Sequence, residues 1–169
     1  MKKLLLLLFI FSSPLLAEFK YQPTFSEFSV IYPVKPKVKI MAFTGNDGVD
    51  AEAIHTMGMK GYSILKAEFL PITDSSALDA LTDDQIRSQM LDYARHNGIK
   101  SSHATVERKN GIRVATLRGT KLQGTDKIPV TYLNKTFYGK RSMLMIYTAA
   151  PSELYPTEET STFLKSVNW

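Results

Sequence analysis

The side chains in this sequence that could do chemistry are few: three histidines, some hydroxyls beside one of them, and single carboxylates. His55, His96 and His103 fall in three different predicted elements, so they lack the short spacing that is typical of a zinc site. Ser101 and Ser102 precede His103, but neighbouring strand residues face opposite sides, and the sequence around them has no Gly-x-Ser-x-Gly elbow. These patterns favour a protein without a catalytic centre, a metal site or a cofactor.

The carboxylates lead to the same interpretation. Glu52, Glu68 and Glu107 each lie alone within a predicted strand, where we expect them to be solvated and not paired. His55 lies on a strand face of small residues, where a structural role is more common than catalysis. An enzyme stays open as an alternative, because folding can bring together groups that are distant in sequence.

The beginning of the chain is typical of a secretory signal. Lys2 and Lys3 precede an apolar run over residues 4–11, which is shorter than the roughly 20 residues that a membrane-spanning helix needs. Ser12, Ser13 and Pro14 follow, and a small residue, Ala17, closes the segment. We therefore predict cleavage after Ala17 and a periplasmic or secreted protein; a retained membrane anchor or a buried helix is the alternative.

Composition limits the classes that the mature chain can belong to. The sequence has no cysteine, which excludes disulfides, a cysteine nucleophile and a lipid anchor on a thiol. The 21 basic and 16 acidic residues form no arginine-rich patch, so no nucleic-acid partner is expected. Once residues 1–17 are removed as a signal peptide, residues 18–169 suffice for a single domain, with no linker or repeat to divide them and no transmembrane helix.

One amphipathic helix is predicted from Thr82 to Gly98. Thr82 can cap its start together with Gln85, and Asn97-Gly98 suits its end. Its apolar side comprises Ile86, Met90, Tyr93 and Ala94. A helix with one apolar side must cover something, and we expect it to cover a sheet.

The remaining chain alternates like strands. A polar lead over 18–24 is followed by strands predicted at 28–32, 35–42, 51–57, 61–69, 102–108, 112–121, 130–138 and 141–148. Asn110-Gly111 and Gly139-Lys140 indicate hairpins, and a second helix is expected after Pro156. The apolar run from Met143 to Tyr147 is expected to be buried on both faces. The prediction is an α+β fold: a three-layer α/β/α sandwich with a central, mainly antiparallel sheet of about six strands and two main helices.

Several phrases of the sequence resemble the PsbP-like superfamily, which includes the extrinsic photosystem II subunit, the Ran-binding Mog proteins and DcrB-like envelope proteins. They are residues 28–33 followed by Lys35-Pro36, the strand opened by Gly61-Tyr62, the Asn110-Gly111 hairpin, residues 130–132 with 137–141, and residues 163–167. The resemblance implies the sandwich fold and binding of other proteins, with no shared catalytic residues to carry over. Without cysteine, the chain departs from the DcrB-like proteins, because it cannot carry their lipid anchor.

The leading functional hypothesis is an exported, soluble envelope protein, not an enzyme, that binds a protein partner or assists an assembly. Lys35, Lys37 and Lys39 are the predicted partner-binding residues; their plainer interpretation is a solvated strand that discourages edge-to-edge pairing. A first alternative is a small-molecule or lipid carrier, with a pocket between sheet and helix that is lined by Met90, Tyr93 and Tyr132. A second alternative is an inhibitor or immunity protein.

Overall fold

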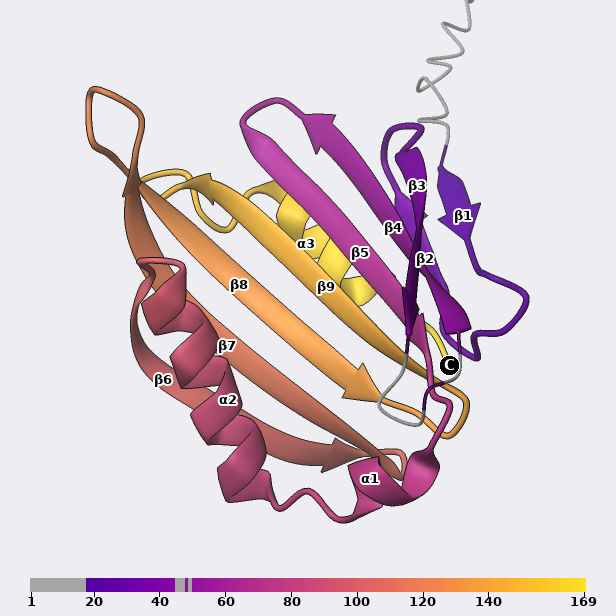
Figure 1. The fold of residues 1–169 in the computed structure, drawn as a ribbon. Helices are drawn as coiled ribbons and strands as arrows, with labels where there is room; N and C mark the ends of the chain where they lie inside the picture. The colour runs from indigo at the N-terminus through magenta and orange to yellow at the C-terminus, as the bar shows by residue number, and fades with distance from the viewer. Residues whose placement is uncertain (1–17, 45–47, 49) are drawn as a thin grey trace, which may run out of the picture.

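A seven-stranded antiparallel sheet forms the centre of the molecule (Figure 1), in a computed structural model that describes residues 18–44, 48 and 50–169. Its strands are β3 (Lys37–Thr44), β4 (Asp50–Lys60), β5 (Ser63–Pro71), β6 (Lys100–Lys109), β7 (Ile112–Gln123), β8 (Ile128–Tyr138) and β9 (Ser142–Pro151). They lie in the order β3-β4-β5-β9-β8-β7-β6. The predicted signal peptide lies outside the described residues.

The sheet consists of two meanders joined by a single pair of strands. Strands β3, β4 and β5 pair in sequence, as do β6, β7, β8 and β9, and only the β5–β9 pair joins the two groups. Both predicted hairpins are confirmed. The β6–β7 turn uses Asn110 and Gly111 at φ values of 50° and 80°, a left-handed conformation that asparagine and glycine tolerate best.

One face of the sheet is covered by helix α2 (Asp83–His96), which packs on β6 and β7. The predicted capping box is present: the Thr82 N–H donates to Gln85 Oε1 at 2.8 Å, and the Gln85 N–H donates to Thr82 Oγ1 at 3.2 Å. Ile86, Met90 and Ala94 are buried against the sheet, whereas Tyr93 is 46% exposed. A short helix, α1 (Ser75–Asp79), precedes α2.

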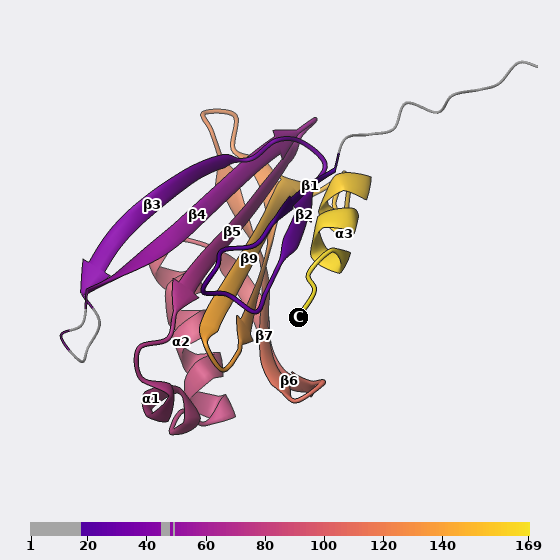
Figure 2. The ribbon, with the colours of Figure 1, turned by 90° about the vertical axis from the view of Figure 1, so that its right-hand side faces the viewer.

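The other face is covered by helix α3 (Glu158–Lys165) and by a separate two-stranded sheet of β1 (Phe19–Tyr21) and β2 (Val30–Tyr32). Figure 2 shows α3 and α2 on opposite sides of the main sheet. The α+β sandwich is therefore confirmed, with more strands than predicted. The expected polar lead contains β1, because Tyr21 packs beside Phe69 at a ring-centroid distance of 5.7 Å.

Strand β2 and strand β9 depart from their predicted surroundings. Strand β2 pairs only with β1 and buries Tyr32 against Phe163, with ring centroids 4.7 Å apart. Over residues 143–147 of β9 the α3 side is fully buried, whereas Met143, Met145 and Tyr147 on the other side are half-buried. The prediction that this run of β9 is buried on both faces was therefore wrong, because α2 packs on β6 and β7.

Candidate functional site

Strand β3 forms one outer edge of the sheet. It pairs with β4 on its inner side, and no other described strand pairs with it. Figure 2 shows β3 and β4 bending away from α3, toward the side on which α1 and α2 lie. Val38 is 49% exposed and Ile40 is 58% exposed, which is unusual for branched apolar side chains in a strand. This strand therefore offers both free backbone groups and apolar side chains to a partner.

The predicted partner-binding lysines belong to this edge. Lys37 and Lys39 lie in β3 and Lys35 precedes it, and all three are exposed. Lys37 and Lys39 face the α2 side of the sheet, while Val38 and Ile40 face the α3 side, because successive strand residues alternate. Within the described chain, no carboxylate lies at ion-pair distance from these lysines.

His55 and Glu68 bring an imidazole and a carboxylate into contact. The register of β4 and β5 places them opposite each other, and His55 Nδ1 lies 3.2 Å from Glu68 Oε1. The Lys66 ammonium also contacts Glu68. The expectation that Glu68 is solvated was therefore wrong, because the β4–β5 hairpin places it opposite His55.

The other histidines do not join this group. His96 Nδ1 lies 2.8 Å from the Asp92 carbonyl oxygen at the end of α2, and His103 lies on β6. The side chains of Ser101 and Ser102 lie outside the described part of the structure. Across residues 18–44, 48 and 50–169, no three histidine, aspartate or glutamate side chains gather in a way that could hold a metal ion.

A groove of about 570 Å³ runs between α2 and the open part of the sheet. Of the predicted pocket residues, Met90 and Tyr93 line it, whereas Tyr132 is buried below and packs beside Tyr147 at a centroid distance of 5.4 Å. Burial raises the pKa of the Tyr147 hydroxyl far above its usual value, so this group is neutral. Sequence analysis missed Met143 and Met145, which also line the groove.

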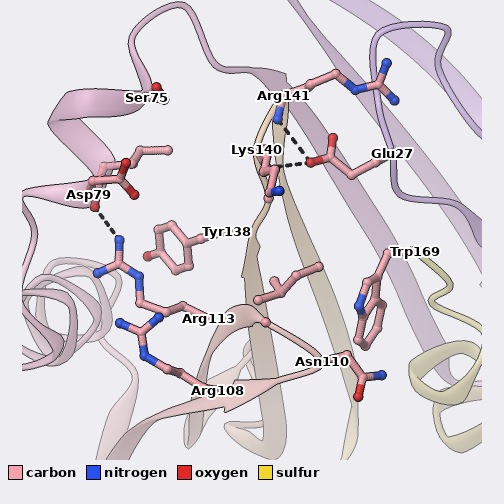
Figure 3. Close-up of a pocket in the computed structure, with 14 residues that line it drawn as sticks. Glu27, Ser75, Asp79, Arg108, Asn110, Arg113, Tyr138, Lys140, Arg141 and Trp169 are labelled. Atoms are coloured by element: carbon pink, nitrogen blue, oxygen red, sulfur yellow. Dashed lines mark hydrogen bonds between the residues drawn. The ribbon is translucent and has the colours of Figure 1, made fainter.

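A second hollow, of about 840 Å³, lies at the end of the sheet where the β6–β7 and β8–β9 turns meet (Figure 3). The sequence analysis did not predict it. Four basic residues line it, together with the two acidic residues Glu27 and Asp79; the basic ones are Arg108, Arg113, Lys140 and Arg141. A signal was present, because Arg108 and Arg113 flank the Asn-Gly turn at the spacing that makes them cross-strand neighbours.

No described helix is long and apolar enough to cross a membrane.

No protein-family model matches the sequence, and no curated protein matches it. Among solved structures, cyanobacterial PsbP (CyanoP) from Synechocystis is similar over 93% of this chain and 95% of its own, with a TM-score of 0.59 and 13% identity. A Pseudomonas aeruginosa protein of unknown function matches over 85% of this chain and 90% of its own, with a TM-score of 0.44 and 12% identity. The resemblance to PsbP is thus confirmed for the architecture: the chain has the PsbP-like fold.

Proposed function

We propose that this chain is an exported, non-catalytic protein that binds a protein partner along the outer edge of β3. The observation that supports this most is the eight-residue edge strand, which exposes Val38 and Ile40 instead of hiding them. The PsbP-like fold is compatible with a non-catalytic role. The signal-like segment over residues 1–17 supports export.

The chemistry of the edge indicates what the partner presents. An added strand forms main-chain hydrogen bonds with β3, and its side chains alternate between the two faces of the sheet. Lys37 and Lys39 favour acidic side chains on one face of that strand, whereas Val38 and Ile40 favour apolar side chains on the other. The partner segment is therefore extended, with acidic and apolar residues in alternation.

The same lysines select against a second copy of this chain. Two β3 edges that approach each other would bring positively charged side chains together, and like charges on adjacent strands destabilise their pairing. An acidic strand meets no such penalty. Strand β3 therefore exposes apolar side chains, while the charges of its lysines favour pairing with a different protein over pairing with a second copy of this chain.

A charge-reversal experiment tests the proposal. A photo-crosslinking amino acid is placed at Ile40, and the purified protein is irradiated with an envelope fraction of its source cells. We expect a discrete crosslinked protein whose modified peptide has the alternating acidic and apolar pattern. The K37E/K39E variant should lose this product because its edge repels the acidic strand.

The matched control is K109E/K127E, which makes the same charge change at exposed positions on β6 and in the turn before β8. This variant should keep the product. A crosslink that survives K37E/K39E unchanged, or the absence of any product from position 40, contradicts binding along β3.

The groove beside α2 favours a second candidate, a carrier of small apolar molecules. Methionine side chains adapt to varied apolar shapes, and Met90, Met143 and Met145 line the groove together. Native mass spectrometry of gently purified protein should then show a bound apolar mass, which M145K should abolish. A bare chain mass under the same conditions contradicts the carrier.

A further inference from the structure

Two arginines face each other across the β6–β7 hairpin. Arg108 and Arg113 are directly opposed in the register of these antiparallel strands, so their side chains leave the same face. Like charges in this position destabilise a strand pair. In the described chain, no carboxylate lies at ion-pair distance from either guanidinium. Figure 3 shows the two guanidinium groups beside one another in the pocket.

Arg113 is held in place and cannot turn away from its neighbour. Its side chain is 8% exposed, and its guanidinium donates hydrogen bonds to the carbonyl oxygens of Leu78 and Leu81, around the end of α1. The guanidinium carbon also lies 5.7 Å from the centre of the Tyr138 ring. A fixed positive charge therefore faces the pocket next to the exposed Arg108.

The acidic residues of the pocket offset this charge only in part. The Glu27 carboxylate accepts hydrogen bonds from the Lys140 N–H at 2.6 Å, the Arg141 N–H at 3.1 Å and the Ser142 hydroxyl at 2.7 Å. Figure 3 shows Glu27 at the β8–β9 turn, on the far side of Tyr138 from Arg108. Asp79 is the other acidic residue, so two carboxylates face the four basic side chains of Arg108, Arg113, Lys140 and Arg141.

We propose that this pocket binds a small organic dianion of the phosphomonoester class. A phosphate group has enough oxygens to accept paired hydrogen bonds from both guanidinium groups, and its double charge removes their mutual repulsion. The organic part of the ligand lies against the apolar lining, which includes Tyr138, Ile112 and Trp169. This site is separate from the β3 edge and does not depend on the proposed partner.

Trp169 supplies the readout, because it is the one tryptophan of the chain and it lines the pocket. Phenyl phosphate, inorganic phosphate and benzoate are titrated into the purified protein at constant ionic strength while tryptophan emission is recorded. We expect saturable binding of phenyl phosphate, with weaker binding of inorganic phosphate and of singly charged benzoate. R108Q should weaken phenyl phosphate binding roughly tenfold or more, since hydrogen bonds to charged groups are the strong ones.

The matched control is K109Q, because Lys109 is the next residue on β6, is exposed and does not line the pocket. K109Q should bind phenyl phosphate as the unmodified protein does, and circular dichroism checks that both variants are folded. The proposal is overturned if R108Q binds as tightly as K109Q, if benzoate binds as well as phenyl phosphate, or if the emission shows no saturable change.

Discussion

Glu27 shows how one side chain can fasten two distant parts of the chain. Its carboxylate, which belongs to the segment between β1 and β2, accepts hydrogen bonds from two backbone N–H groups of the β8–β9 turn and from the hydroxyl of Ser142 at the start of β9. Gly139 allows this approach: a Cβ there would overlap the Glu27 carboxylate and lie 2.8 Å from Phe28 Cε2. Burial alone would raise the pKa of Glu27, but these hydrogen bonds outweigh it and lower the pKa below the ordinary value of 4.5.

Glu27→Gln tests this fastening through its pH dependence. A carboxyl group with a lowered pKa in the folded protein stabilises the fold above its unfolded pKa, and this contribution is lost as the pH falls from 4.5 through the folded value. We expect the variant to be less stable at pH 7 by about 1 kcal/mol. The difference in urea-unfolding free energy should shrink below pH 4.

The control for this variant is Glu153→Gln, at an exposed position. It should follow the unmodified protein at every pH. If the Glu27 and Glu153 variants show the same pH dependence, the Glu27 hydrogen bonds contribute nothing measurable.

Residue pairing across strands could be predicted from the sequence only where the turn between the strands was recognised. Glu68 was expected to be solvated, yet it lies opposite His55, because Gly61-Tyr62 forms the two-residue turn of the β4–β5 hairpin and not the start of a strand, as the sequence analysis expected. Arg108 and Arg113 were within reach of sequence reasoning, because the Asn110-Gly111 turn fixes the register of their hairpin. A two-residue turn fixes the register of its hairpin once it is recognised as a turn, whereas the β5–β9 register has no such turn to fix it.

At the scale of elements, helix α2 was predictable because its signals are local. Thr82, Gln85 and the Asn97-Gly98 end all act within one turn of the helix they bound, and the structure has both halves of the capping box. Strand β1 and the half-exposed side of β9 were missed for the opposite reason. Whether a strand joins the main sheet, and how far a helix extends over it, depends on packing between distant segments.

Thr82→Ala measures the contribution of the cap. The substitution removes the acceptor for the Gln85 N–H, and we expect a loss of about 1 kcal/mol in the free energy of unfolding. Thr162→Ala, at an exposed position inside α3, should change stability by no more than a few tenths of a kcal/mol, and in the stabilising direction. Equal losses in the two variants would show that the cap is not responsible. Thermal or urea unfolding provides the comparison.

At the scale of the whole molecule, the sheet ends on one side in the apolar, lysine-bearing strand β3. Edge strands of this kind can pair with further copies, and charged side chains are one means of preventing it. Lys37 and Lys39 are the charged residues within β3. Removing the charges of Lys37 and Lys39 therefore tests whether they prevent the β3 strands of two copies from pairing.

K37A/K39A should therefore increase self-association. We expect the double variant to form dimers or larger species at concentrations where the unmodified protein sediments as a monomer, because Val38 and Ile40 remain exposed without the repelling charges. Sedimentation velocity across a concentration series gives the measurement, and K109A/K127A is the matched control. A K37A/K39A protein that stays monomeric throughout would mean that these lysines are not needed to keep the edges apart.

The single β5–β9 junction has a consequence for the order in which the molecule assembles. Every other neighbouring pair in the main sheet joins strands that are consecutive in the chain, so each can form early as a local hairpin. Pairing Leu65 with Thr148 instead requires closing a long loop, whose entropy is lost before the contacts are gained. Folding kinetics should consequently be limited by this closure: substitutions that weaken the junction slow the formation of the native sheet, while each meander still collapses on its own timescale.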